Sequence, residues 1–457
     1  MRRSLSAVLV VGLLSGSGVV SAAPADPAYP SAEWAAREAA NFAKVAEAPA
    51  EQVDPAFQQR WNEQSVANRN EQVARDNADP NWNSRGNACA SWGGPCTGDP
   101  YRYPGVDPFY ANEGDVVAVN FYDKEGARLS GRVWAPKGSA AGAGLPGVVI
   151  ITGSVQAPET LYWWMAQDLV RAGYAVLTFD VRGQGRSDNR TRDGQSGTNI
   201  NSAVFATNLI DAIDFFRSSP ARPYPHNARF PEVATTPSNP IWDRLDPERL
   251  GIVGHSLGAT GVSVVQGIAD WPGAMDAANP VDVAVAWDNV SATGSLAGHT
   301  VEPRVPMMGQ SGDYYLAPTP YTSPPDPQSK KLGFNRWRDA GIPAYQLQIR
   351  GGSHYEWSLL PGFPTSSWDW GNPLANHYTL AWLDRWLKLD GEAGYRDADA
   401  RLLADGDWRD RLSFYFPSAR AFPDRRGVWW RCEDMLREDC PAGDGLPFGW
   451  GGAARRR

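Results

Sequence analysis

Apolar residues in the middle of the chain form short, nearly continuous runs that alternate with stretches of helical periodicity. The runs have the length of buried strands, and near-continuous apolar strands are typical of a parallel sheet covered on both faces. The alternation predicts an α/β fold with a mostly parallel central sheet flanked by helices. The predicted strands are 116–121, 129–134, 147–151, 174–179, 250–253, 283–287, 305–308 and 345–349. The predicted helices between them are 158–172, 201–218, 257–269, 328–340 and 375–388.

The first 25 residues have the pattern of a secretory signal peptide. Arg2 and Arg3 precede an apolar run at 7–14, and small residues follow, which places the expected cleavage after Ala22 or Ala25. The run is shorter than the ~20 residues that cross a bilayer. We therefore expect an exported, soluble mature protein that has no membrane segment after signal cleavage.

The remaining chain divides into three parts. Residues 26–113 form an N-terminal extension of helices and loops, with two helices expected between 31 and 77 that are separated near Pro55. The strand–helix alternation spans 114–390, interrupted by a surface insertion at 219–248. Residues 391–457 are rich in Arg and Asp and are predicted to be irregular.

Composition narrows the class of function. The 457 residues include 43 Lys plus Arg and 51 Asp plus Glu, which gives a formal net charge of −8. Nucleic-acid-binding domains usually carry a basic excess, so no nucleic-acid partner is expected. The 20 Trp, 37 Pro and 46 Gly favour a loop-rich enzyme over a helical bundle. Neither a metal nor a cofactor is expected, and the oligomeric state is left open.

The four cysteines lie in two close pairs. They allow three pairings, of which local pairing, Cys89 with Cys96 and Cys432 with Cys440, is the simplest. An oxidising destination favours disulfides over an all-cysteine zinc site.

The strongest chemical signal is the pentapeptide Gly254-His255-Ser256-Leu257-Gly258, which lies between a predicted strand and a predicted helix. A Gly-x-Ser-x-Gly sequence in this context forms a tight elbow that holds the serine at the carboxyl edge of a sheet. The alternative is a structural serine in a turn. We predict that Ser256 is a nucleophile.

A serine nucleophile needs a histidine base, and that base needs a carboxylate to orient it. Among the five histidines, His354 follows the strand at 345–349 through a short Gly-Gly-Ser loop, at the edge where Ser256 is expected. Asp313, which follows the strand at 305–308, is the preferred acid. Asp288, at the end of the strand at 283–287, is its rival. The order Ser256, Asp313, His354 is that of the α/β-hydrolases.

The chain resembles the α/β-hydrolases over roughly residues 114–390. A second match is the segment 174–187, whose Asp180-x-Arg182-Gly-x-Gly-x-Ser loop is similar to one beside the active site in many members. The resemblance implies an α/β-hydrolase fold and structural roles for Asp180 and Arg182.

The resemblance also implies an oxyanion hole. One N–H would come from Leu257, the residue after the nucleophile, and the other from Ser154 or, preferably, Val155. The loop departs from the His-Gly-Gly-Gly form of some lipases, which argues against a true lipase.

Aromatic residues follow each predicted catalytic loop and suggest an apolar or aromatic substrate wall. The candidates are Trp163, Trp164, Tyr314 (with Tyr315 next to it) and Trp357. The alternative is that these rings only pack the loops, because aromatic side chains dominate cores generally.

The combined prediction is a secreted serine hydrolase that cleaves small or polymeric carboxylic esters through an acyl-enzyme. A secreted serine peptidase or amidase is the first alternative, since the same triad cleaves amides. A non-catalytic binding protein on this scaffold is the second.

Overall fold

Ten strands form a single sheet in the order β1-β2-β4-β3-β5-β6-β9-β10-β11-β12. This computed structural model describes residues 26–46, 50–87, 97–154, 157–197, 200–231, 234–291, 295–296, 299–359, 368–438 and 440. The six central strands pair in parallel, and the pairs at both edges are antiparallel. The strands are β1 (Gly114–Tyr122), β2 (Arg128–Pro136), β3 (Leu145–Ile151), β4 (Ala175–Phe179), β5 (Leu245–His255), β6 (Val283–Trp287), β9 (Met307–Gly312), β10 (Ala344–Ile349), β11 (Ala419–Pro423) and β12 (Trp429–Cys432). A separate two-stranded sheet is made by β7 (Ser295–Leu296) and β8 (His299–Thr300).

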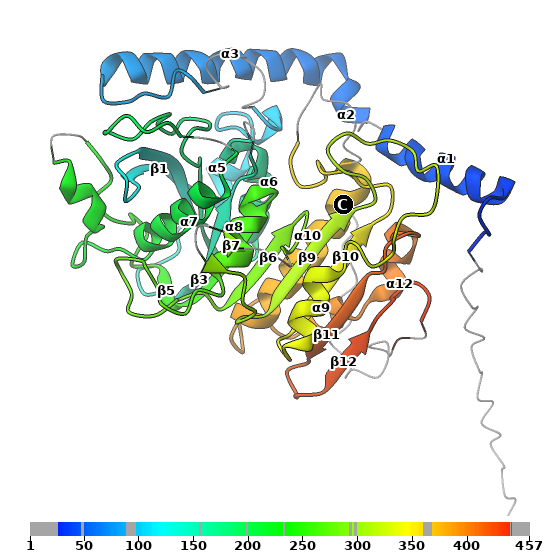
Figure 1. Cartoon of the computed structure of the whole chain (residues 1–457). Helices are drawn as coiled ribbons and strands as arrows, with labels where there is room; N and C mark the ends of the chain where they lie inside the picture. The colour runs from blue at the N-terminus through cyan, green and yellow to red at the C-terminus, as the bar shows by residue number, and fades with distance from the viewer. Residues whose placement is uncertain are drawn as a thin grey trace, which may run out of the picture.

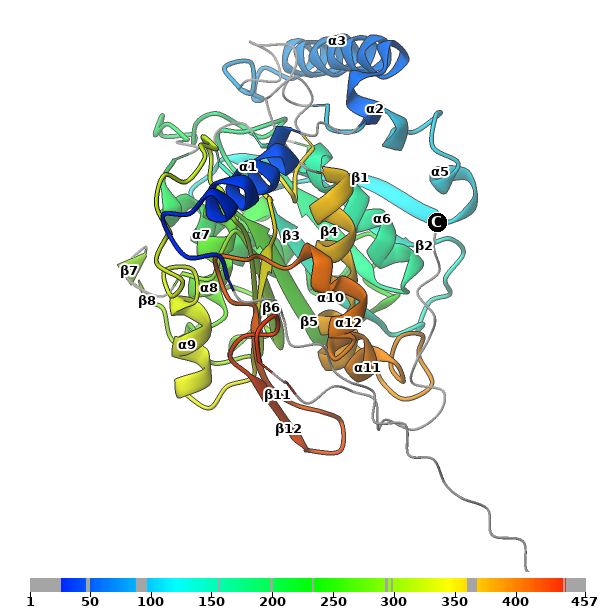
Figure 2. The ribbon, with the colours of Figure 1, turned by 90° about the vertical axis from the view of Figure 1, so that its right-hand side faces the viewer.

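Helices cover both faces of the sheet, which is seen nearly edge-on in Figure 2. The helices of one face are α7 (Ser202–Phe216), α8 (Leu257–Val265) and α9 (Leu332–Asp339), and those of the other are α6 (Trp163–Arg171) and α10 (Trp368–Leu387). Successive residues of β3 alternate between the two cores: Val149 and Ile151 face the first, Val148 and Ile150 the second. Both faces of a central strand are therefore buried, which explains its continuous apolar sequence.

Every predicted strand and helix has a counterpart, with shifted ends. Helix α10 begins at Trp368, earlier than predicted, and contains Pro373. Proline lacks the N–H of a helix interior, so the sequence favours a later start. The predicted insertion at 219–248 contains the 3₁₀ helix Pro225–Arg229 and the first residues of β5.

The described part of the N-terminal extension begins with three helices that lie in a row along one side of the molecule (Figure 1). They are α1 (Ala32–Ala46), the short α2 (Ala50–Val53) and α3 (Pro55–Ala78), and the small helices Pro100–Arg102 and α5 (Phe109–Asn112) follow. The predicted break near Pro55 is the start of α3, where the Asp54 side chain accepts a hydrogen bond from Ala56 N. Within the described residues, no helix has the length and apolar character needed to cross a membrane.

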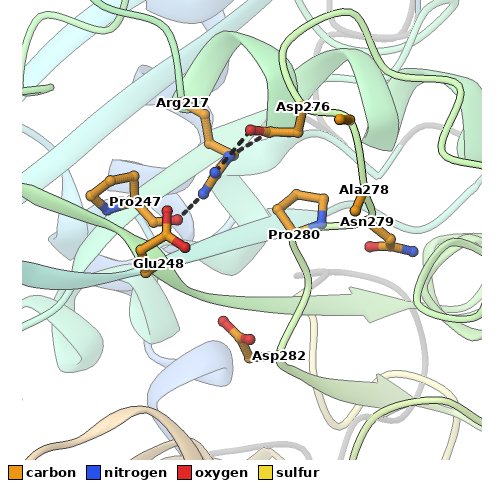
Figure 3. A pocket seen from close by; sticks show the side chains of 9 residues that line it. Arg217, Pro247, Glu248, Asp276, Ala278, Asn279, Pro280 and Asp282 are labelled. Carbon is orange, nitrogen blue, oxygen red and sulfur yellow. Dashed lines mark hydrogen bonds and ion pairs between the residues drawn. The ribbon is translucent and has the colours of Figure 1, made fainter.

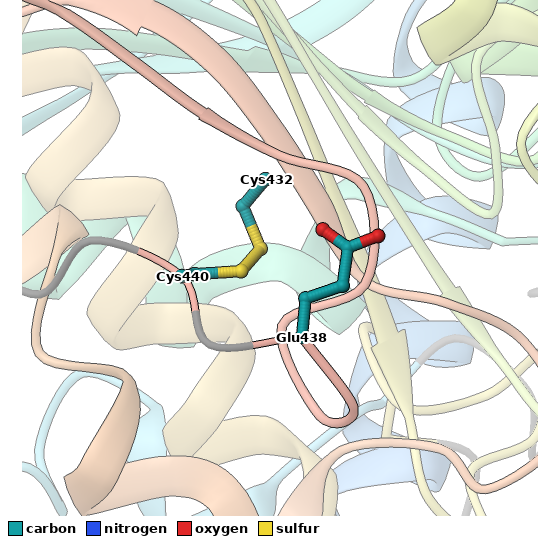
Figure 4. Close-up of side chains that lie close together, drawn as sticks. All are labelled: Cys432, Glu438 and Cys440. Carbon is teal, nitrogen blue, oxygen red and sulfur yellow. A yellow bond between two sulfur atoms is a disulfide. The ribbon is translucent and has the colours of Figure 1, made fainter.

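The C-terminal region, predicted as irregular, is more ordered than expected. It contains α11 (Ala398–Leu402), α12 (Asp405–Trp408), the 3₁₀ helix Arg409–Arg411, and the hairpin β11–β12, which extends the sheet beyond β10. The Cys432–Cys440 disulfide is present (Figure 4). Glu438 lies beside it, but the two sulfur atoms are bonded to each other and offer no pair of thiolates to a metal. Cys89 and Cys96 lie outside the described residues.

These features define the fold. A mostly parallel sheet with helices on both faces carries a strand–elbow–helix turn at Ser256, between β5 and α8. The chain has the α/β-hydrolase fold.

Candidate active site

The candidate nucleophile lies on a sharp turn between β5 and α8. Ser256 has φ of 57°, a left-handed conformation that is costly for a residue with a side chain. The flanking glycines permit this turn. A Cβ atom on Gly254 would lie 2.5 Å from the carbonyl oxygen of Gly258, and one on Gly258 would lie 2.4 Å from that of Thr152. The elbow expected from the sequence is therefore present, with the Ser256 side chain half-buried.

The structure places Ser256 and His354 next to each other. His354 lies in the turn after β10, and its Nε2 is 3.0 Å from Ser256 Oγ. The opposite ring nitrogen, Nδ1, is hydrogen-bonded to Asp288 Oδ2. Because a carboxylate only accepts, Nδ1 carries the proton and the Nε2 lone pair faces the serine hydroxyl. This is the tautomer required of a base acting on Ser256.

The acid in this contact is Asp288, so the preference for Asp313 over its rival is wrong. Asp288 follows β6, has φ of 53°, and accepts a second hydrogen bond at Oδ1 from Ser311 Oγ at 2.6 Å. Burial acts to raise its pKa, but the hydrogen bond and attraction to His354, with Lys330 and Ser311, hold that pKa below its usual value. Ser256 and Asp288 are the two non-glycine residues with positive φ among the described residues, and such strained conformations cluster at functional sites.

The strand register explains why Asp313 is elsewhere. Trp287 at the end of β6 lies level with Gln310 of β9, so Asp288 lies next to Ser311. Strand β9 continues to Gly312, which places Asp313 further along. Its buried carboxylate accepts from Asn41 Nδ2 and from the Gly351 N–H, both at 2.8 Å.

The loop after β3, which is predicted to supply one oxyanion donor, lies against Ser256. A Cβ atom on Gly153 would be 3.2 Å from Ser256 Cβ. The Gly153 N–H donates to Tyr162 Oη at 3.0 Å, which leaves Ser154 as the described candidate in this loop. Val155 lies outside the described residues. Leu257 is the first residue of α8, where backbone N–H groups have no partner within the helix.

His255 connects these loops although it is not the base. It is buried; its Nε2 donates to the carbonyl oxygen of His354 at 2.8 Å, and its Nδ1 accepts from the Tyr162 hydroxyl at 2.8 Å. Burial, and then repulsion from His354, lower the pKa of His255 to about 3. His255 is therefore neutral at physiological pH and fixed by both ring nitrogens. The position of His255 inside the Gly-x-Ser-x-Gly motif is the one local signal in the sequence for this role.

The aromatic candidates for substrate binding belong to the core instead. Trp163, Trp164, Tyr314 and Trp357 are each at most 3 % exposed. An exposed ring beside His354 is that of Tyr315, which is 60 % exposed and packs edge-on against His354 with 5.1 Å between ring centroids. Asp180 and Arg182 are buried in hydrogen-bonded networks, in agreement with the structural roles expected of them.

A hollow of about 310 Å³ lies at the opposite edge of the sheet, where β5 and β6 begin (Figure 3). Arg217 spans it and bonds both carboxylate oxygens of Asp276 and the carbonyl oxygen of Pro247. The hollow is lined from the amino ends of strands, whereas Ser256, Asp288 and His354 lie at their carboxyl ends. It is therefore not part of the candidate active site.

Comparison with known proteins gives distant structural likenesses. No protein-family model matches the sequence, and no curated protein matches it. An acetyl xylan esterase from Paenibacillus sp. R4 is similar in structure, with 19 % sequence identity and a TM-score of 0.27. That match covers 40 % of this chain and spans only half the length of the Paenibacillus protein. Thermogutta terrifontis esterase 2, in a form phosphorylated by paraoxon, is 13 % identical with a TM-score of 0.39, over 56 % of this chain and 91 % of that one. At these scores the likenesses carry no argument about chemistry, and the fold assignment rests on the sheet and the elbow described above.

Proposed function

We propose that the protein is a serine hydrolase that cleaves carboxylic esters. The observation that carries the proposal is the contact of Ser256 Oγ with His354 Nε2, at 3.0 Å, in a ring whose other nitrogen is bound to Asp288. This arrangement of a hydroxyl, a correctly protonated imidazole and a buried carboxylate is the one that activates serine for acyl transfer.

The proposed reaction has two halves. His354 removes the proton of Ser256 as its oxygen bonds to the acyl carbon, and the negative charge that develops on the carbonyl oxygen is held by backbone N–H groups. Leu257 and either Ser154 or Val155 would supply these donors, each typically worth about 3 kcal/mol in the transition state. The C–O bond of the ester then breaks, and the leaving alcohol takes its proton from His354.

In the second half, water attacks the acyl-enzyme. His354 takes a proton from the water as the new C–O bond forms, and returns it to Ser256 Oγ as the acyl–serine bond breaks. The products are a carboxylic acid, an alcohol and free enzyme. Asp288 stays ionised throughout and stabilises the imidazolium form of His354 in each half.

Substrate class is tested by turnover on p-nitrophenyl esters of graded acyl length, next to aminoacyl and peptidyl anilides. We expect ester turnover to exceed anilide turnover. Ser256→Ala and His354→Ala should each lower kcat by several orders of magnitude, and the double variant should be little worse than either, because the two residues act as one unit. Faster turnover of anilides would favour the peptidase or amidase. Absence of Ser256-dependent turnover on both classes would favour the binding protein.

Export is a separate part of the proposal. It is supported by the charged, apolar and small-residue order of residues 1–25 and by the disulfide near the C-terminus. Expression of the full chain in an export-competent host, followed by N-terminal mass analysis of the protein in the medium, tests it. The expected mature N-terminus follows Ala22 or Ala25.

A further inference from the structure

Asp313 has a buried carboxylate that joins three distant parts of the chain. Its Oδ2 accepts from Asn41 Nδ2 of helix α1 and from the backbone N–H of Gly351, each at 2.8 Å. Its Oδ1 accepts from the hydroxyl of Ser413, in the C-terminal region. All three donors are uncharged, and the Asp313 side chain is 0 % exposed. Burial raises the pKa of Asp313, opposed by the bonds from Ser413, Asn41 and Gly351.

Helix α1 is held at this point by a second buried carboxylate. Glu38 Oε1 accepts from Tyr314 Oη at 2.9 Å and from the Tyr321 N–H at 2.7 Å, and its Oε2 accepts from the Tyr415 hydroxyl. Tyr321 Oη in turn donates to the carbonyl oxygen of Asp313 at 2.6 Å. The N-terminal helix is therefore bonded to the loop after β9 and to the C-terminal region through buried polar groups, which are costly to separate.

The third partner, Gly351, begins the turn that carries the catalytic histidine three residues later. Gly351 has φ of 62°, and a Cβ atom there would be 2.4 Å from Lys44 Cβ, so α1 packs directly on this turn. The Tyr314 N–H donates to the carbonyl oxygen of Gly352 at 2.9 Å. The N–H groups of Asp313 and Tyr314 bond the carbonyl oxygens of Ile349 and Gly352, and α1 packs on Gly351. Together these contacts fix the path of the chain that leads into His354.

We propose that Asp313 is a positioning residue that anchors helix α1 and Ser413 to the turn of His354, so that the N-terminal extension is required for the histidine to reach Ser256. This inference rests on the proposed hydrolase function for its kinetic consequence. Asp313 does not contact the side chains of Ser256 or His354. It acts through the N–H of Gly351.

The chemistry of the anchor separates it from a catalytic acid. Asp313→Asn keeps one oxygen that can accept from Asn41 and Gly351, so it should retain activity to within about tenfold. Asp313→Ala leaves buried donors without an acceptor, and we expect kcat to fall about 10- to 100-fold while KM changes little. The shape of the pH–rate profile should stay that of the wild type, because the triad keeps all its members.

The experiment compares Asn41→Ala, Asp313→Ala, their double variant and Asp313→Asn in the full chain. The matched control is Glu33→Ala, an exposed position on the same helix. Each variant is assayed for kcat, KM and pH profile, and hydrogen exchange is measured in peptides covering residues 32–46 and 344–354. We expect faster exchange in both peptides for Asn41→Ala and Asp313→Ala, wild-type behaviour for Glu33→Ala, and a double variant no worse than Asp313→Ala.

Two results would overturn the inference. One is wild-type kcat and exchange in Asn41→Ala and Asp313→Ala. The other is a loss in Asp313→Asn as large as in Asp313→Ala together with an altered pH profile, which would make Asp313 an acid of the reaction. Failure of the proposed function is distinguishable, because a wild-type protein without Ser256-dependent turnover still reports on the anchor through hydrogen exchange.

Discussion

Replacement of Asp288 by asparagine removes one charge from the triad and changes almost no volume. In the wild type, Asp288 Oδ2 accepts from His354 Nδ1 and Oδ1 accepts from Ser311 Oγ at 2.6 Å. If the amide oxygen of the introduced asparagine accepts from Ser311, its NH₂ group faces His354 Nδ1 and forces the ring proton onto Nε2. The ring then has no lone pair toward Ser256 and cannot take its proton.

The size of the effect follows from these two losses. A wrong tautomer together with an unstabilised imidazolium lowers kcat by about 10⁴-fold in serine hydrolases of this kind, or about 5.5 kcal/mol of transition-state stabilisation. Ser311→Ala is the graded control. It removes one hydrogen bond to a charged group, about 1.5–3 kcal/mol, so activity should fall about 10- to 150-fold.

The assay is steady-state hydrolysis of the best p-nitrophenyl ester at fixed ionic strength, with the folded fraction of each variant checked by circular dichroism. We expect kcat to be highest in the wild type, lower in Ser311→Ala and lowest in Asp288→Asn. Activity of Asp288→Asn within tenfold of wild type, with a collapse in Asp313→Asn, would refute the assignment of the acid.

Three further predictions concern stability and the substrate wall. Because the pKa of His255 is about 3 when folded and 6.5 in the reference state, the unfolded chain binds more protons between these values, and stability falls as the pH drops through that window. In urea titrations, the change of the unfolding free energy with pH should be smaller in His255→Gln than in the wild type, by up to about 1.4 kcal/mol per pH unit. An equal pH dependence in the two proteins would contradict this prediction. Tyr315→Ala should raise KM for long-chain or aromatic esters about two- to tenfold, while KM for the acetyl ester stays unchanged, since the exposed ring offers contact only to a larger group. An equal change for all esters would exclude that contact. The paired change of Cys432 and Cys440 to alanine should lower the free energy of unfolding by about 2–3 kcal/mol in urea titrations, and an unchanged midpoint and slope would show that the disulfide is dispensable.

The sheet and two of the three members of the proposed triad could be predicted from sequence because their signals are local. Each central strand has an apolar run of its own, and Ser256 lies in a motif with its strand and helix adjacent to it. His354 follows a strand through a short loop. Parallel strands deliver their carboxyl ends to one edge, so both side chains are expected at the same edge of the sheet once the strands are known.

The acid could not be chosen in this way, because Asp288 and Asp313 both follow strands that are neighbours in the sheet. The choice depends on how far β9 extends and on Asn41, which is 272 residues from Asp313 in sequence. Neither is a local property of the chain.

The errors at the substrate wall and at the C-terminus have a similar origin. The sequence around an aromatic residue that follows a predicted catalytic loop does not show whether its side chain is exposed, as that of Tyr315 is, or buried, as that of Trp357 is. Strands β11 and β12 have five and four residues, too few to show a clear alternation, and they join the sheet through the pairing of β11 with β10.

The proposal that Ser256 is an activated nucleophile can be tested by covalent labelling with a fluorophosphonate, followed by peptide mapping. We expect a single adduct on the peptide that contains Ser256, formed in folded wild-type protein and absent from Ser256→Ala. Labelling of another serine, or none in folded protein, would contradict it.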